Sequence, residues 1–219
     1  EILSCTLDPG GFRRHLCDPA TERAPLLPAI NVREPYGFSN AADELAFDQT
    51  PEINIQRSIC GAVFTDEGYR LCIEDSIIES IPLTVGFNVH HFAIANASGT
   101  NAQRLTRFAC PLILRNVTIL GRVRAFSAEG GGGIFTGALE VYDQQKGCLK
   151  FCYFADEKKA GAIKNILPPH FACVFGHDAR LVFTSEFFND PGFCQLSLDC
   201  DRRILEEGIG DDQMGAFNF

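Results

Sequence analysis

Two pairs of charged residues have side chains that could take part in glycan cleavage. Glu74 and Asp75 are adjacent carboxylates, and Arg122 and Arg124 flank a single valine. Cleavage of a glycosidic bond uses an acid together with a base or nucleophile, held about 5 to 9.5 Å apart. Neither pair lies in a diagnostic motif, and charged pairs at turns are usually solvated. We therefore treat both pairs as weak candidates for an exposed groove and expect no catalytic site from them.

Other reactive side chains lack the partners that their chemistry requires. Ser76 is not part of a Gly-x-Ser-x-Gly elbow, and Cys148 and Cys152 have only sparse histidines to act as a base. The adjacent His90 and His91 would point to opposite faces of a strand, and no further ligand follows at a diagnostic spacing. The sequence therefore predicts no cofactor and no metal site.

Two segments of unusual composition are also more easily explained without a ligand. Gly130 to Gly133 lacks the Gly-Lys-Ser/Thr ending and the following helix of a phosphate-binding loop, so we expect a flexible connector. Residues 199–212 contain six carboxylates, but not the Asp-x-Asp-x-Asp-Gly order of a calcium loop. We expect this acidic segment to be a solvated loop.

Composition limits the classes of partner. The 28 acidic residues exceed the 19 basic ones and give a net charge of -9, which disfavours nucleic acid and anionic membranes as partners. No apolar run approaches the roughly 18 residues of a membrane helix. The chain is 46% hydrophobic, enough for a substantial core. Its ten cysteines include no Cys-x-x-Cys pair, and we favour reduced thiols packed as small apolar residues over disulfides.

A repeated pattern indicates how the core is built. Segments 53–61, 71–79 and 112–120 each have an apolar residue, any residue, a second apolar residue, two polar residues, a small residue, and then strand-forming residues. Residues 2–7 match the same pattern, and a looser fifth copy begins at Leu139 and runs to Gln144. Recurring segments of this kind are typical of a solenoid, in which neighbouring coils bury one another.

The register of the repeat predicts the inward positions. Because alternate strand residues share a face, Ile2, Ile55, Ile73 and Leu114 should stack in the interior. The polar pair that follows each of them should turn a corner of the coil. The sequence thus predicts an all-β fold, a right-handed parallel β-helix (β-solenoid) with irregular loop insertions.

The spacing of the copies also predicts the domain organisation. We expect solenoid coils over residues 1–155, with insertions at about 8–51, which is rich in proline, and 84–108. Residues 156–219 should form a C-terminal coil or capping segment of the same domain.

The second half of the chain resembles a known family. An ordered succession of short motifs carries the resemblance, at residues 116–125, 133–136, 144–153, 183–185, 189–197 and 213–217. Together they resemble the uncharacterised right-handed β-helix proteins encoded near the baseplate genes of phage-tail-like, contractile-injection-type particles. The resemblance covers about half of the chain and implies a β-helix, association with such a particle and no catalytic residues. Residues 154–160 depart from the family pattern, and the family continues beyond Phe217, so we expect this chain to be part of a longer protein.

Two functions follow as hypotheses. The first is a non-catalytic structural or binding protein that joins protein partners in a larger assembly, such as a phage-tail-like particle. The alternative is a carbohydrate-active β-helix, either a polysaccharide lyase or hydrolase or a glycan-binding module. We expect a cytoplasmic or particle-associated location, and the start at Glu1 leaves an upstream secretion signal open.

Overall fold

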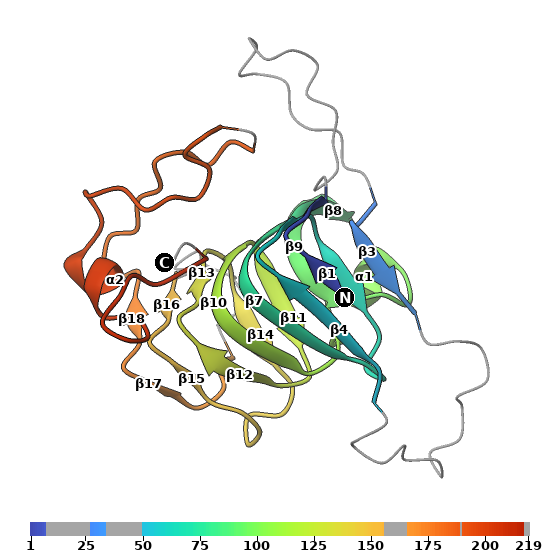
Figure 1. The fold of residues 1–219 in the computed structure, drawn as a ribbon. Helices are drawn as coiled ribbons and strands as arrows, with labels where there is room; N and C mark the ends of the chain where they lie inside the picture. Colours follow the sequence, from blue (N-terminus) through green and yellow to red (C-terminus); the bar gives the residue numbers. More distant parts are fainter. Residues whose placement is uncertain (8–26, 34–49, 156–165, 189, 217–219) are drawn as a thin grey trace.

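Short parallel strands, stacked in register, form the core of this protein (Figure 1). A computed structural model describes residues 1–7, 27–33, 50–155, 166–188 and 190–216. Two sheets, of 12 and 6 strands, contain all of its strands, and every strand pairing between coils is parallel. The prediction of an all-β, solenoid-like fold is therefore confirmed at that level.

The first face of the stack has one strand from each of seven coils. These strands pair in the order β1 (Ile2–Leu3), β4 (Glu52–Gln56), β7 (Arg70–Glu79), β10 (Leu112–Leu120), β12 (Ala128–Gly131), β15 (Leu149–Lys150) and β17 (His170–Phe171).

Two further faces complete each coil. The second face belongs to the same sheet and holds the second halves of β7 and β10 with β2 (Thr6–Leu7), β5 (Ile59–Cys60), β13 (Ile134–Phe135), β16 (Tyr153–Phe154) and β18 (Val174–Phe175). The third face is the other sheet and holds β3 (Ile30–Val32), β6 (Val63–Thr65), β9 (Asn88–Asn96), β11 (Arg122–Ala125) and β14 (Leu139–Val141).

The pairing register matches the repeat found in the sequence. Ile2 pairs with Ile55, Ile55 with Ile73, and Ile73 with Leu114, and the last three are at most 1% exposed. The predicted inward row is therefore confirmed. The fifth copy was placed wrongly, because Leu139 pairs with Val123 on the third face. The residue that follows Leu114 in the row is Gly130.

In every coil, one residue in the left-handed backbone conformation forms a bend between the first face and the second. Arg57, Asp75 and Asn116, each the second member of a predicted corner pair, have φ values of 46°, 46° and 48°. The corner prediction is confirmed, although the left-handed region disfavours most side chains. The bend residues of successive coils lie one above another in a column. The register adds four residues to it, which are Ser4, Gly132, Phe151 and Ala172.

In the second and third coils the residue after the bend is a serine that ties one coil to the next. The Oγ of Ser58 accepts the Cys5 N–H at 3.0 Å, and the Oγ of Ser76 accepts the Ser58 N–H at 3.0 Å. Each hydroxyl also donates to the carbonyl two residues earlier. These side chains replace the ladder hydrogen bonds that the bend interrupts, which explains the small residue in the repeat.

The four-glycine run is part of the coil, so the prediction of a flexible connector was wrong. Gly130 and Gly131 lie in β12, and Gly132 is the bend residue, with φ of 71°. A Cβ at Gly130 would lie 1.8 Å from the Leu114 carbonyl oxygen, and one at Gly133 would lie 2.9 Å from the Phe135 ring. Close approach between coils therefore requires glycine here.

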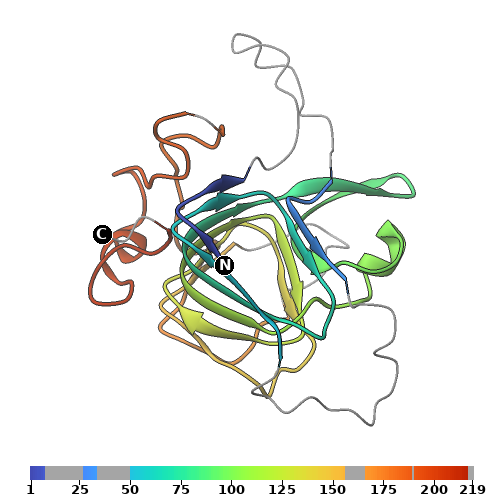
Figure 2. The same cartoon turned by 45° about the vertical axis from the view of Figure 1, so that its right-hand side comes forward.

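The expected insertion at 84–108 contains a strand of the third face. β9 runs through it and pairs with β6 and β11, while β8 (Ile81–Val85) forms an antiparallel hairpin with β9. The short helix α1 (Asn101–Arg104) follows and is capped by Thr100. Figure 2 views the coils nearly end-on and shows the hairpin and α1 projecting on one side. Of the other expected insertion, only residues 27–33 and 50–51 lie in the described chain.

The C-terminal segment covers the outer side of the second face. After β18 the chain leaves the stack and returns through α2 (Arg202–Glu206), on the side away from the hairpin in Figure 2. Ile204 and Met214 pack with Ile134, and Ala216 packs with Ile77. From β7 to β18 the outward residues in the row of Ile77 are consequently buried, whereas Thr6 in the first coil is exposed.

Candidate functional site

Glu74 and Asp75 lie at the end of the first-face part of β7. Glu74 points outward and forms an ion pair with Arg115 of the next coil at 3.5 Å, with side chains 39% and 65% exposed. Asp75 is the bend residue, and its Oδ1 accepts a hydrogen bond from Asn116 Nδ2 at 3.0 Å. Both carboxylates thus contact the equivalent corner of the next coil.

Arg122 and Arg124 lie on the third face and are buried. Both guanidinium groups bind the carboxylate of Glu140, which is fully buried, with Arg122 Nη2 2.5 Å from Oε1 and Arg124 bound to Oε2. The guanidinium carbon of Arg122 lies 5.4 Å from the centre of the Phe92 ring, and that of Arg124 lies 4.4 Å from the centre of the Phe108 ring. Burial lowers the pKa of Arg124, and the charge of Glu140 opposes that shift.

This Arg-Glu-Arg cluster connects adjacent coils. Glu140 comes from β14 and the two arginines from β11, its neighbour in the sheet. The arginines are therefore on a different face from Glu74 and Asp75, and the four candidate residues do not form a common groove. Sequence reasoning missed Glu140, because only the coil register places it opposite Arg124.

The outer side of the first face is the accessible surface of the stack. We call it the first-face surface; its exposed or partly exposed outward strand residues are Leu3, Glu52, Asn54, Gln56, Arg70, Cys72, Glu74, Ile113, Arg115, Glu129, Lys150 and Phe171. By contrast, the outward residues Ile77 and Ile134 of the second face and Phe64 and Glu140 of the third are at most 2% exposed. The first-face surface carries both signs of charge, and its ion pairs, such as Arg70 with Glu52 at 3.9 Å, run from coil to coil.

A second exposed feature is an aromatic cluster where the third face ends. The Tyr142 ring lies 5.5 Å from the centres of both the Phe108 and Phe126 rings, and Tyr142 is 66% exposed. Lys146 Nζ lies 5.6 Å from the centre of the Phe126 ring and 3.8 Å from an Asp143 carboxylate oxygen. The cluster offers an exposed Tyr142 ring, tilted by 57° and 34° against the two phenylalanine rings, with polar groups beside it. The repeat of an aromatic residue after β11 and after β14 could have revealed it in the sequence.

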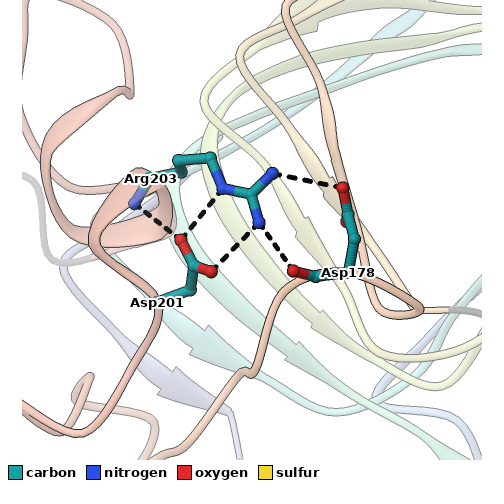
Figure 3. Close-up of polar contacts among 3 residues, drawn as sticks. All are labelled: Asp178, Asp201 and Arg203. Carbon is teal, nitrogen blue, oxygen red and sulfur yellow. Dashed lines mark hydrogen bonds and ion pairs between the residues drawn. The ribbon is translucent and has the colours of Figure 1, made fainter.

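In the acidic C-terminal segment, Asp201 is bound by an arginine. Figure 3 shows Arg203 between Asp201 and Asp178. Its Nη2 lies 3.0 Å from Asp201 Oδ2, and its Nη1 lies 3.2 Å from Asp178 Oδ2. Hydrogen bonds from Arg203 lower the pKa of both aspartates. Asp201 also caps α2, so this part of the segment anchors the helix to the turn after β18.

The remaining candidates have structural surroundings. His90 and His91 lie on β9 opposite Leu83 and Pro82 of the hairpin. Ser76 is held in the hydrogen-bonded column after the bend. Within the described ranges, no three His, Cys, Asp or Glu side chains are grouped so that they could hold a metal ion.

In the part of the chain that the structure describes, neither helix has the length and apolar character that a membrane-spanning helix requires.

Comparison with protein-family models, with curated proteins and with solved structures found no match for this chain.

Proposed function

We propose that this protein is a non-catalytic β-solenoid that binds a protein partner through its first-face surface. The observation that carries the proposal is the contrast between faces. The second and third faces are covered by the chain's own segments, whereas the first presents solvated charges of both signs in register from coil to coil. A rigid surface with mixed charge favours specific pairing with a complementary protein surface.

The assembly that we propose is a phage-tail-like, contractile particle, and the proposed winding of the coils is right-handed. The resemblance of residues 112–217 to β-helix proteins encoded near baseplate genes supports the particle. The strong preference of parallel crossovers for the right-handed sense supports the winding. The cytoplasm or the particle itself is the corresponding location.

Co-sedimentation with purified contractile particles tests this function. The wild-type protein should pellet with the particles, and the double variant Arg115→Glu/Lys150→Glu should lose on the order of ten-fold in binding, because two charges of the surface are reversed. Arg202→Glu is the matched control, since its side chain is 84% exposed and lies away from the first face. Absence of the wild-type protein from the pellet, or equal loss in the control, would contradict the proposal.

The aromatic cluster favours a glycan-binding module as the second candidate function. An exposed ring such as Tyr142, with Lys146 and Asp143 beside it, suits the apolar face and the hydroxyl groups of a sugar. Affinity electrophoresis through a panel of soluble polysaccharides should then show retardation that Tyr142→Ala abolishes. Phe187→Ala is the control, because Phe187 is 62% exposed on the C-terminal segment.

The same panel separates binding from cleavage. If the polysaccharide is degraded and the Glu74→Ala/Asp75→Ala variant loses that activity, the protein is an enzyme and the non-catalytic proposal fails. If the protein is retarded but the polysaccharide is not degraded, the glycan-binding function is supported over the protein-assembly function.

A further inference from the structure

Cys152 and Cys173 occupy the same position in consecutive coils. Tyr153 pairs with Val174 and Lys150 with Phe171 in parallel register, so the two cysteines lie side by side in the column after the bend. Neighbouring strands lie about 4.8 Å apart. This spacing falls in the range of about 4.4 to 6.8 Å between Cα atoms that a disulfide spans.

The other members of the column are small residues that do not form a second pair of neighbouring thiols. Cys5 is followed by Ser58 and Ser76, then by Val117 and Gly133, and only afterwards do two sulfur-bearing residues come in succession. In the described chain this is the one place in the column where adjacent coils could be joined covalently.

The two thiols differ in accessibility and in hydrogen bonding. Cys152 is fully buried, and its sulfur accepts the Gly133 N–H at 3.3 Å while the thiol lies 3.2 Å from the Lys150 carbonyl oxygen. Cys173 is partly exposed. One thiol is therefore open to a small reagent, and the other lies behind it, where only a neighbouring group can reach it.

The surroundings also favour ionisation of the accessible thiol. A hydrogen bond from the Cys152 side chain lowers the pKa of Cys173 to about 7, with further help from the Cys152 N–H and from His170, although burial opposes this shift. Burial raises the pKa of Cys152 well above its usual value. Cys173 is thus the better nucleophile near neutral pH, because the thiolate is the reactive form.

We infer that Cys152 and Cys173 are a redox-active pair that hydroperoxides convert reversibly into a disulfide between the last two coils. The Cys173 thiolate attacks the outer oxygen of the hydroperoxide, the O–O bond breaks, and the alkoxide takes up a proton to leave as an alcohol, or as water from hydrogen peroxide. The sulfenic acid formed on Cys173 is then attacked by the Cys152 sulfur. The S–S bond forms, the S–O bond breaks, and the hydroxyl leaves as water with the Cys152 proton. The two thiols lose two electrons, and the hydroperoxide gains them.

Peroxide treatment of the full chain tests this assignment. Peptide mass spectrometry after stoichiometric hydrogen peroxide should find a Cys152–Cys173 cross-link that has lost two hydrogen atoms and that a dithiol reductant restores. Cys152→Ser should instead leave a sulfenic acid on Cys173 that a dimedone probe traps, and Cys173→Ser should give neither product. The matched control is Cys148→Ser, which should form the cross-link normally, because Cys148 is also partly exposed but aligns with Glu129 and Pro169.

Alkylation kinetics add a readout that needs no oxidant and no mutation. At pH 7 iodoacetamide should modify Cys173 on the order of ten-fold faster than Cys148, which reflects its larger thiolate fraction. Two outcomes would overturn the inference. One is a cross-link that forms equally in Cys173→Ser through another residue, and the other is peroxide treatment that leaves both thiols free. The proposed partner-binding function does not enter either measurement.

Discussion

The middle and the C-terminal coils follow the same path with different side chains. Between β4 and β10 the inward rows hold aliphatic residues, such as Ile73 and Leu114 on the first face and Ile119 on the second. From β12 onward the first row begins with Gly130, and the second row continues with phenylalanine. The rings of Phe135 and Phe154 stack with centres 5.2 Å apart, and Phe175 follows 5.7 Å beyond Phe154.

The difference shows that the same backbone path accepts side chains of different size and type. A phenylalanine on one face is accommodated because glycine replaces a side chain on the neighbouring face, as at Gly133 beside the Phe135 ring. The exchange is specific to the coil of β12 and β13, because the following coil packs Leu149 on the first face together with Phe154 on the second. Four substitutions test the comparison.

The largest effect is expected from a charge in the aliphatic row. Leu114→Asp should unfold or aggregate the protein, because Leu114 is 1% exposed and an unpaired buried carboxylate costs several kcal/mol, on the order of the total stability. Circular dichroism during heating measures this. The control Arg115→Ala removes only an exposed ion pair and should cost about 1 kcal/mol or less. An unchanged melting temperature for Leu114→Asp would show that the register is wrong.

A methyl group in the glycine coil should have the next largest effect. Gly130→Ala is expected to lower the free energy of unfolding by about 3 kcal/mol or more, because its φ is 129° and the new Cβ would clash with the Leu114 carbonyl. Urea unfolding gives the value. Gly210→Ala separates the two causes, since Gly210 has φ of 80° but no atom within 4 Å of the added Cβ. It should cost only about 1 kcal/mol, and equal losses would mean that close approach between coils is unimportant.

The aromatic row should be more sensitive to a conservative change than the aliphatic row. Phe154→Leu removes three ring contacts, with Phe135, His170 and Phe175, and should cost about 2 kcal/mol, whereas Ile119→Val should cost about 1 kcal/mol. Paired urea titrations compare the two. If the Phe154 variant loses no more than the Ile119 variant, the stacked rings add nothing beyond apolar area.

The smallest effect is expected at the bend. Arg57→Gly should change the free energy of unfolding by less than about 0.5 kcal/mol, because relief of the left-handed φ of 46° offsets the added entropy of the unfolded chain. Arg57→Val should cost about 1 to 2 kcal/mol, since a β-branched residue fits that conformation poorly. If the free energy of unfolding rose by a similar amount in both variants, the bend would not be the source of strain.

The comparison also explains which coils could be predicted from the sequence. The inward row from Ile2 to Leu114 was found because its members have similar side chains. The row was not followed to Gly130 because glycine there gives no apolar signal, nor to His170 because a polar residue stands in the row. Leu139 was assigned to the wrong face because its strand is equally apolar, and only pairing with Val123 identifies the third face.

The candidate site was less predictable, because it depends on contacts between coils. Arg122 and Arg124 share one face of a strand, as their spacing implies, but a sequence cannot show that the outer side of that strand is covered. Their partner Glu140 is 16 residues from Arg124 in the chain. The exposed ion pair of Glu74 with Arg115 likewise joins residues 41 positions apart (115 − 74) and becomes visible only when the register is known.

The C-terminal segment forms a strap over the second face, and this strap has a consequence for synthesis on the ribosome. Coils of a solenoid contact only their neighbours and could stack one by one as they emerge. Here Ala216 donates its N–H to Thr118 Oγ1 at 3.1 Å, and Gly215 donates to the Gly132 carbonyl at 2.7 Å. The outer apolar row of the second face therefore stays exposed until nearly a hundred further residues have been translated, and a nascent chain halted before the strap would present that row to chaperones.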